Sequence, residues 1–235
     1  MSDAAIILTH PDGRKEEIYR PTPKQLLYHA SNVPNLIMEG ARGSGKSLAL
    51  RMDAHMRALA MPGFRYIIMR RNFPELRRSH LVYVGDEMAK FGGTYLKTQA
   101  ECRYANGSLG AFGHIENEDD VNKYLSAEYH LIALDEIVTF SWDMVTKVAA
   151  SARRTKGTKF TPLLRGATNP LGISADEVCQ YFITKDVPDD PDYDPSDWDS
   201  IHLDISDNPH LDAEDYTKRL KSLPEAYRKA WLNGE

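Results

Sequence analysis

Cysteine, long hydrophobic runs and a basic N-terminus are scarce or missing in this sequence of 235 residues. Its two cysteines, Cys102 and Cys179, are far apart and have no metal-type spacing, so we expect both to be reduced packing residues in a cytoplasm. No apolar run approaches the ~18 residues that a membrane-spanning helix needs. The first residues lack the basic start of a signal peptide. These absences disfavour secreted and membrane proteins.

The composition is that of one globular domain with a sizeable core, at 42% hydrophobic and 27% charged residues. The net charge of −5 conceals an asymmetry, because residues 161–235 carry 7 basic and 16 acidic side chains whereas residues 1–160 carry 22 and 18. Seven aspartates and three prolines lie between Asp186 and Asp199. Such a segment repels itself, so we expect an exposed loop or linker. A Ca²⁺ loop is the alternative, but the glycine of an EF-hand is missing.

Residues 40–47, Gly-Ala-Arg-Gly-Ser-Gly-Lys-Ser, match the phosphate-binding pattern G-x-x-x-x-G-K-[ST]. An apolar run at 35–38 predicts a strand before them, and apolar residues at helical spacing predict a helix after them that ends at 61–63. Strand, glycine loop and helix together predict a nucleoside triphosphate site, with a glycine-rich turn and a surface lysine as the alternative. The expected nucleotide-binding residues are Gly40, Ala41, Arg42, Gly43, Ser44, Gly45, Lys46 and Ser47.

The rest of the chain alternates between strand and helix patterns, which predicts an α/β fold with a mostly parallel sheet. Asn106-Gly107 is a two-residue hairpin signal between two short strands. We expect a three-layer P-loop NTPase sandwich of the RecA-like type over residues 1–183, with a β-hairpin insertion. Residues 184–235 are expected to form the acidic loop and a small C-terminal helical lid. The expected strands are 65–69, 94–98, 101–105, 108–112, 129–135, 161–167 and 200–205, and the expected helices are 74–91, 117–126, 142–152, 175–183, 212–222 and 224–232.

Two acidic residues, Asp135 and Glu136, follow the near-continuous apolar run at 129–134. A run of this kind is typical of a parallel strand covered on both faces, and its carboxyl end lies at the same sheet edge as the phosphate loop. Asp135 can then hold Mg²⁺ through water, and Glu136 can orient or deprotonate the attacking water. A nucleotide kinase delivers phosphate to another substrate and does not need this second carboxylate, so the pair predicts ATP hydrolysis. The alternative is a strand that ends in two surface acids.

A third polar group, Thr168-Asn169, ends the next predicted strand and precedes Pro170. A polar side chain at this place can sense the γ-phosphate or the attacking water. Asn-Pro is equally an ordinary turn pair, so this assignment stays open between sensor and turn.

Five segments of the chain, taken in order, resemble the ATPase domain of the large terminase subunit, the DNA-packaging motor of tailed bacteriophages. The resemblance rests on residues 19–25, the phosphate loop, residues 64–71, Asp135-Glu136 and residues 167–170. Residues 207–211, 223–228 and 231–235 resemble the segment that closes that domain. The family continues into an RNase H-like nuclease, and this chain stops where that domain would begin. We therefore expect an isolated ATPase domain without nuclease activity.

The resemblance implies roles for individual residues. Lys46 and Ser47 match the phosphate and Mg²⁺ ligands, Asp135 the Mg²⁺ residue and Glu136 the catalytic carboxylate, while Thr168 and Asn169 match the coupling motif. Gln25 resembles the residue that reads adenine, with a polar helix-start residue as the alternative. Arg42 matches a basic residue that contacts the γ-phosphate as a cis arginine finger or a toggle.

The resemblance also implies partners. These are ATP and Mg²⁺, double-stranded DNA, further copies of the chain in a ring of five on the portal, the portal protein and the small terminase subunit, in the cytoplasm of an infected bacterium. A physical argument supports the ring, because the 65 residues after Pro170 are too few for a second RecA-like domain. An extra cation on the transition state is worth roughly 10³–10⁵ in rate. Unless Arg42 supplies it, a neighbouring subunit must. The candidates are Lys123, Arg153 and Arg154, each of which could equally be a solvated surface charge.

Two groups of basic residues could follow a DNA backbone without reading bases. They are Arg65, Arg70, Arg71, Arg77 and Arg78, and Lys147, Arg153, Arg154, Lys156 and Lys159. Solvated helix faces or subunit contacts are the alternatives, and the negative net charge predicts weak, salt-sensitive binding. Two other functions remain open at this stage. One is a different P-loop motor or helicase-type fragment, and the other is a nucleotide-responsive assembly module that turns over slowly.

Overall fold

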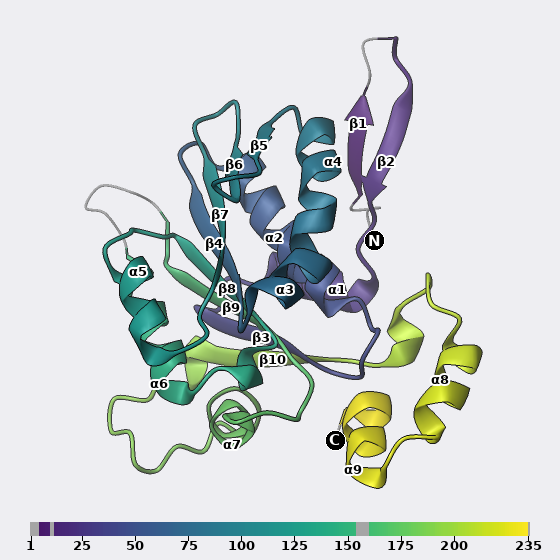
Figure 1. Ribbon diagram of the computed structural model, residues 1–235, viewed down its shortest axis with the longest axis vertical. Helices are drawn as coiled ribbons and strands as arrows, with labels where there is room; N and C mark the ends of the chain where they lie inside the picture. The colour runs from purple at the N-terminus through teal and green to yellow at the C-terminus, as the bar shows by residue number, and fades with distance from the viewer. Residues whose placement is uncertain (1–4, 10–11, 154–159, 235) are drawn as a thin grey trace.

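A central sheet of eight strands organises the protein (Figure 1). The computed structural model describes residues 5–9, 12–153 and 160–234. The strand order is β10-β3-β9-β8-β4-β7-β6-β5, in which every neighbouring pair from β10 to β7 is parallel and the last two pairs are antiparallel. The strands are β3 (Asn35–Gly40), β4 (Arg65–Arg70), β5 (Thr94–Leu96), β6 (Glu101–Arg103), β7 (Leu109–His114), β8 (Leu131–Asp135), β9 (Leu163–Ala167) and β10 (Trp198–Leu203).

Helices cover the sheet, and a separate antiparallel hairpin, β1 (Ile6–Thr9) with β2 (Lys15–Tyr19), projects from the N-terminal side (Figure 1). The helices are α1 (Pro23–Ala30), α2 (Lys46–Ala60), α3 (Phe73–Leu76), α4 (Val82–Lys90), α5 (Asn122–Leu125), α6 (Trp142–Ala149), α7 (Ala175–Val178), α8 (Ala213–Lys221) and α9 (Glu225–Arg228). Single π-helical turns join α3 to α4 (Arg77–Leu81), extend α7 (Cys179–Thr184) and extend α9 (Lys229–Asn233). Short 3₁₀ turns occupy Glu118–Val121, Ile137–Thr139, Pro195–Asp197 and Ile205–Asp207.

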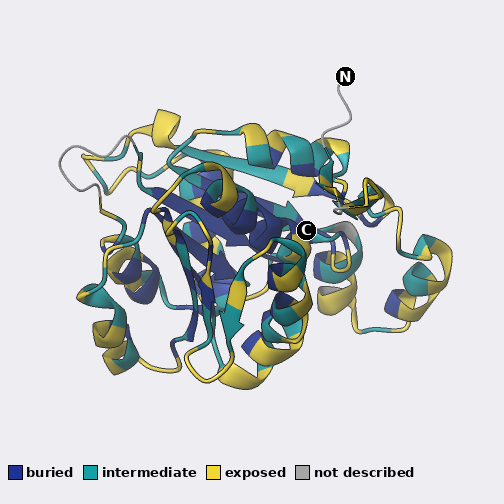
Figure 2. Cartoon of the chain, turned by 90° about the horizontal axis from the view of Figure 1, so that it is seen from above, coloured by how far each residue is buried: buried dark blue, intermediate teal, exposed yellow. Residues whose placement is uncertain are grey.

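Successive residues of the central strands pack into two different cores, one on each face of the sheet. In β8, Leu131 and Ala133 join the core beneath α2 and α4, whereas Ile132 and Leu134 join the core beneath α6 and the turn after α7. All five residues of β8 are buried, and the dark centre of Figure 2 shows the same for the sheet as a whole. Burial on both faces explains why the strand reads as a continuous apolar run rather than an alternating one.

The predicted α/β fold with a mostly parallel sheet is confirmed, and so is the hairpin turn, because Asn106-Gly107 connects the antiparallel pair β6 and β7. The predicted helix over 74–91 contains a π-helical turn, which the apolar spacing did not reveal. The predicted helix over 117–126 is a 3₁₀ turn followed by one turn of α5, because Asn117 and Asp120 form a capping box there. The hairpin of β1 and β2 was not predicted.

The chain beyond residue 183, where we expected the core to end, returns to the sheet. β10 begins at Trp198 and pairs parallel with β3 along the whole length of β3, from Asn35 to Gly40. After β10 the chain packs α8 and α9 beside the phosphate loop through a small apolar cluster around Ala41, Ile205 and Leu220. Sequence positions 40 and 203 are therefore neighbours in space.

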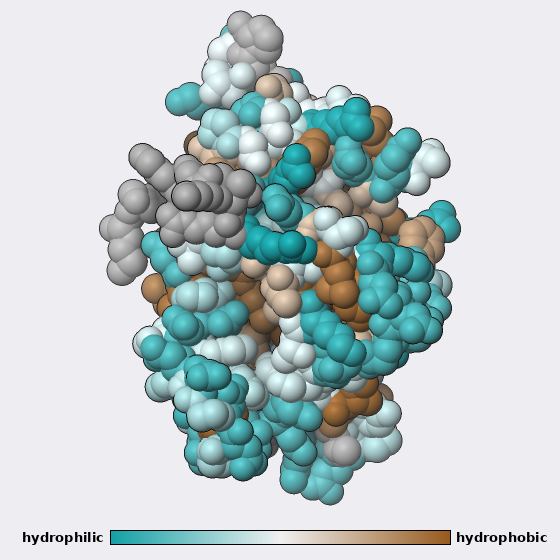
Figure 3. Space-filling model, turned by 90° about the vertical axis from the view of Figure 1, so that its left-hand side faces the viewer, coloured by the Kyte–Doolittle hydropathy of each residue, from teal (hydrophilic) through white to brown (hydrophobic). Residues whose placement is uncertain are grey.

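The face in Figure 3 is largely hydrophilic, with small separate hydrophobic patches. Within the part of the chain that the structure describes, no helix combines the length and the apolar character that crossing a membrane requires.

Candidate active site

The phosphate-loop motif forms a tight connection between the end of β3 and the start of α2. Its backbone requires glycine, because Gly43 and Gly45 have φ angles of +82° and +90° in the left-handed region. Gly40 has a φ of +117°, and a Cβ at that position would lie 2.4 Å from the carbonyl oxygen of Leu203. The glycines thus serve both the turn and the close approach of β10. The first turn of α2 then places Lys46 and Ser47 at the loop, with the free N–H groups of a helix N-terminus.

Lys46 is buried, and its ammonium lies inside the loop. The Nζ atom donates to the carbonyl oxygens of Gly40 (3.0 Å) and Ala41 (2.6 Å) and to the side-chain oxygen of Asn169 (3.3 Å). Burial lowers the pKa of this ammonium to about 8, although the nearby carboxylates of Glu136 and Asp135 favour its charged form. The charge of Lys46 is therefore held where a phosphate group of a ligand would approach the loop N–H groups.

Asp135, the last residue of β8, is 1% exposed and accepts hydrogen bonds from three different elements. Its Oδ1 accepts from the Ser47 hydroxyl (3.0 Å), and its Oδ2 accepts from Arg70 Nε (2.7 Å) and His80 Nε2 (2.9 Å). Burial acts to raise the pKa of Asp135, but the His80 and Arg70 contacts outweigh it and the pKa is lowered. An ionised carboxylate next to a hydroxyl is a hard oxygen pair, which fits Mg²⁺ that keeps further ligands from water and phosphate.

Glu136 follows in a strained backbone conformation, with φ 58° and ψ 54°, that directs it away from the strand path. Both of its carboxylate oxygens accept from the Asn169 side-chain amide, at 3.0 and 3.1 Å. Burial and the neighbouring Asp135 raise the pKa of this carboxyl group, whereas Arg70 and Lys46 oppose the rise. Asn169 thus bridges Lys46 and Glu136 through the two ends of one amide.

A hollow of about 890 Å³ brings these side chains together. The phosphate loop and the first turn of α2 form one wall, Glu136 and Asn169 a second, and Arg70, Glu75 and Ser79 a third. Tyr227 and Trp231 from the C-terminal segment line the rim. Lys46, Ser47, Glu136 and Asn169 therefore converge on one cavity at the carboxyl ends of β3, β8 and β9, where open α/β sheets place their ligands. Asp135 lies directly behind Ser47 and does not line the cavity.

Other expected site residues lie at the edge of this cavity or behind it. Gln25 is buried beneath the loop; its Nε2 donates to the Gly45 carbonyl (3.3 Å), and its Oε1 accepts from Tyr19 and from the backbone of Thr22. Thr168 donates its hydroxyl to the carbonyl oxygen of Asn169 (2.8 Å) and does not line the hollow.

Arg42 extends toward the C-terminal segment. Its guanidinium stacks 4.3 Å from the centre of the Trp231 ring, and its backbone N–H donates to the Trp231 carbonyl oxygen (2.9 Å). Asn208 adds a hydrogen bond to the carbonyl of Gly43 (2.7 Å). The outer side of the phosphate loop is thereby attached to residues more than 160 positions later in the chain.

Two of the three candidate trans-acting cations, Lys123 and Arg153, do not line the hollow. Lys123 is exposed and pairs with Asp120 (2.5 Å), and Arg153 donates to the carbonyl oxygen of Leu125 (2.5 Å). Arg154, Lys156 and Lys159 lie outside the described residues.

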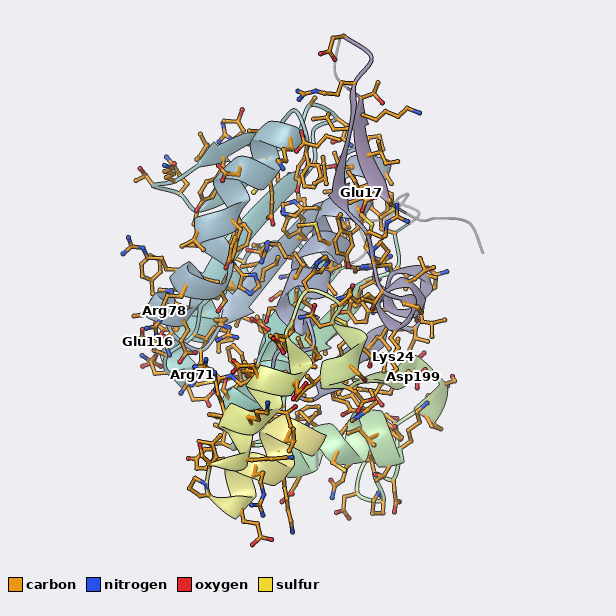
Figure 4. The ribbon with its side chains drawn as sticks, turned by 90° about the vertical axis from the view of Figure 1, so that its right-hand side faces the viewer. Glu17, Lys24, Arg71, Arg78, Glu116 and Asp199 are labelled. Carbon is orange, nitrogen blue, oxygen red and sulfur yellow. The ribbon has the colours of Figure 1, made fainter. Side chains whose placement is uncertain are left out.

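The basic residues of segment 65–78 divide into two kinds. Arg70 and Arg71 are engaged within the chain, the first with carboxylates and the second with the carbonyl of Ile115, whereas Arg65, Arg77 and Arg78 are exposed. Figure 4 shows Arg71 and Arg78 at one edge of the molecule together with Glu116.

Sequence reasoning missed three residues that complete the site, namely Arg70 as a carboxylate partner, His80 and Trp231. Arg70 ends β4 just as Asp135 ends β8, and the register of Met69 with Leu134 in neighbouring strands brings the two together. A polar residue directly after a predicted strand was the available signal, but the adjacency of β4 and β8 is not visible in the sequence. His80 lies in the π-helical turn and is fully buried.

Comparisons with known proteins identify the family and the fold of this chain. Residues 37–235 match the family described as terminase large subunit, T4likevirus-type, N-terminal. No curated protein matches the chain in sequence. Among solved structures, the large terminase of a thermophilic bacteriophage superposes with a TM-score of 0.72 at 14% identity, over 92% of this chain and 54% of that one. The ATPase domain of the Thermus phage P74-26 large terminase gives 0.65 at 15% identity, over 91% and 93%.

The large terminase of bacteriophage HK97 gives a TM-score of 0.58 at 13% identity, over 92% of this chain and 51% of that one. The chain thus spans about half the length of the first and third of these proteins and nearly all of the P74-26 ATPase domain. The family match over residues 37–235, on a fold shared with these structures, shows that the chain belongs to the T4likevirus-type large terminase subunits and carries their N-terminal domain.

Proposed function

We propose that this chain is an Mg²⁺-dependent ATPase that drives double-stranded viral DNA into a procapsid. The observation that carries the proposal is the convergence of Lys46, Ser47, Glu136 and Asn169 on one hollow, with Asp135 buried behind Ser47 and hydrogen-bonded to its hydroxyl. The large terminase of the thermophilic bacteriophage, whose fold this chain shares, has been solved with ADP and with ATP-γ-S. The shared fold and the geometry of the phosphate loop in this chain support nucleotide binding at the loop.

Each side chain has a defined task in this proposal. The loop N–H groups and Lys46 hold the β- and γ-phosphates, and Ser47 and Asp135 would hold Mg²⁺, which supplies positive charge to the phosphate oxygens. Glu136 accepts a hydrogen bond from the attacking water and orients it in line with the γ-phosphorus. Asn169 keeps the Glu136 carboxylate on the phosphate side of the site. Gln25 contacts adenine only if its present hydrogen bonds to the loop and to Thr22 exchange.

Phosphate release by the purified chain tests the assignment. Lys46→Ala should abolish both nucleotide binding and turnover, whereas Glu136→Gln should keep nucleotide binding and lose turnover by about 10³-fold or more, because it removes only the water-orienting carboxylate. Lys97→Ala, an exposed lysine between β5 and β6, is the matched control and should behave as the wild type. Turnover that survives Glu136→Gln would contradict the assigned base.

Motor function requires partners that the domain alone does not contain. We propose that copies of the chain form a ring on the portal protein and act with the small terminase subunit in the cytoplasm of the infected bacterium. Lys123, Arg153 or Arg154 would then supply a cation to the neighbouring hollow, since Lys123 and Arg153 do not line their own. Hydrolysis per subunit should fall on dilution, and a rate that stays constant over a wide dilution range would contradict the ring.

One observation favours the slower alternative of a nucleotide-responsive assembly module. Lys46 is bound to its own loop carbonyls, and Arg42 is stacked on Trp231, so both cations of the loop are engaged within the chain. Turnover that stays slow both alone and on a portal ring would select this alternative.

A further inference from the structure

We propose that Arg70 is a positioning residue of the ATPase site, one that holds Asp135 and Glu136 in register, rather than a residue of the DNA path. The proposal rests on the function proposed above. Sequence reasoning grouped Arg70 with its basic neighbours, but its surroundings in the structure are acidic and enclosed.

The guanidinium of Arg70 faces three carboxylates on two segments, Glu75 in α3 and the consecutive pair Asp135 and Glu136 at the end of β8. Its Nε donates to Asp135 (2.7 Å), and its other two nitrogens lie 3.4 Å from Glu75 and 3.7 Å from Glu136. The Arg70 side chain is 12% exposed, and it lines the same hollow as Lys46 and Asn169. A planar, permanently charged fork is suited to several carboxylates at fixed angles, as the compact ammonium of lysine is not.

The two carboxylate oxygens of Asp135 accept hydrogen bonds from different donors. Oδ2 is taken up by Arg70 and His80, so that Oδ1 turns toward the Ser47 hydroxyl. His80 is itself fixed from behind, because its Nδ1 lies 3.3 Å from Arg51, which leaves Nε2 as the donor to Asp135. Arg70 and His80 thus determine which oxygen of Asp135 is free to face a metal.

The same guanidinium also determines the environment of Glu136. Asp135 and Glu136 are consecutive carboxylates whose side chains are 1% and 26% exposed, and like charges on neighbouring residues repel each other more strongly as they are withdrawn from water. Arg70 stands between them and opposes that repulsion, while Glu75 holds the far side of the guanidinium. Loss of Arg70 would leave Asp135 with two of its three donors and Glu136 with Asn169. The predicted defect is therefore in the orientation of the attacking water and not in the binding of nucleotide.

Three variants of the full chain test this: Arg70→Gln, Arg70→Lys and, as the matched control, Arg78→Gln, which replaces an exposed arginine of the π-helical turn that follows α3. Four quantities are measured: kcat and KM for ATP with Mg²⁺, the dissociation constant of a fluorescent ADP analogue, the affinity for a short DNA duplex at low salt, and the unfolding temperature. We expect Arg70→Gln to lower kcat by about 100-fold, as a misplaced catalytic group does, with ADP affinity kept within about threefold. Arg70→Lys should lower kcat by about tenfold or more, because one ammonium cannot contact both carboxylates.

The outcomes separate the possibilities. DNA affinity should be the same in Arg70→Gln and the wild type, and basal turnover should be the same in Arg78→Gln and the wild type. Wild-type kcat in either Arg70 variant, or a loss of DNA affinity with kcat retained, would overturn the proposal. A parallel loss of ADP affinity, kcat and unfolding temperature in Arg70→Lys would show a merely structural role and overturn it too. If Arg70→Gln fails to fold, the kcat and the ADP affinity of Arg70→Lys alone test the proposal. A wild-type chain that releases no phosphate would instead refute the proposed function.

Discussion

Replacing Glu87 with Gln removes the centre of a buried polar chain behind the site, and the structure predicts the size and the pH dependence of the effect. Glu87 lies on α4, and its carboxylate accepts two hydrogen bonds from Arg51 Nε and one from Arg51 Nη2, at 2.8–3.0 Å. His55 lies 3.3 Å away. Burial acts to raise the pKa of Glu87, but His55 and Arg51 outweigh it and lower the pKa to about 2.

The direction of the pH dependence follows from the linkage between proton binding and folding. A carboxyl group whose folded pKa is about 2, against 4.5 unfolded, stabilises the protein above pH 4.5 and loses that contribution as the pH falls toward 2. At 1.36 kcal/mol per pKa unit, the contribution is about 3 kcal/mol at pH 7 and about 1 kcal/mol at pH 3. Glu87→Gln should therefore lower the free energy of unfolding by about 3 kcal/mol at pH 7, which agrees with the cost of breaking one side of a buried ion pair.

Urea unfolding of the wild type and Glu87→Gln, from pH 7 down to pH 3, measures this difference directly. Other acidic groups titrate in both proteins, so their contributions cancel in the comparison. The matched control is Asp86→Asn, an exposed neighbour on the same helix, for which the difference should stay near zero. If the difference in the free energy of unfolding between wild type and Glu87→Gln is the same at pH 3 and pH 7, the linkage argument is refuted. A difference near zero at pH 7 would show that the ion pair between Glu87 and Arg51 does not stabilise the protein.

Three further predictions concern the phosphate loop and its contacts. Asn169→Ala removes two hydrogen bonds to the Glu136 carboxylate, worth about 1.5–3 kcal/mol for a charged acceptor, so steady-state phosphate release should fall by about 10–100-fold; unchanged release would contradict it. Gly40→Ala places a methyl group against the β10 backbone at a positive φ, and the free energy of unfolding in urea should drop by about 2–4 kcal/mol; a wild-type unfolding midpoint would show that the approach is not tight. A double-mutant cycle of Trp231→Leu with Arg42→Gln should give a coupling energy of about 0.5–2 kcal/mol in unfolding, and a value near zero would mean that the stacking adds no stability.

The parts of the site that the sequence predicts are those encoded by short local patterns. The glycine loop needs its residues at fixed spacing, and Asp135 follows a run whose burial on both faces already indicates a parallel strand. Because parallel strands share their carboxyl edge, the approach of Asp135 to Ser47 could be expected without coordinates. The hairpin at Asn106-Gly107 was predictable for the same reason, since two residues fix its turn.

What could not be predicted depends on strand order and on helix irregularity. The sequence around Arg70 does not indicate that β4 lies beside β8, so the carboxylate partners of Arg70 could not be predicted. Its basic neighbours suggested a DNA contact instead. The apolar spacing gave no sign of the π-helical turn at Arg77–Leu81, and the letter at position 80 gave no sign that His80 contacts Asp135. Trp231 meets Arg42 only because the chain returns to the loop after β10.

The pairing of β10 with β3 has a consequence for the order in which the newly made protein matures. Until Leu203 has left the ribosome, the strand that carries the glycine loop has an open edge, and the N–H of Ala41 has no acceptor there. Residues 40–47 are translated early, yet they reach their final shape among the last parts of the domain. A nascent chain arrested before residue 198 should accordingly be recognised by chaperones, and one released beyond residue 234 should not.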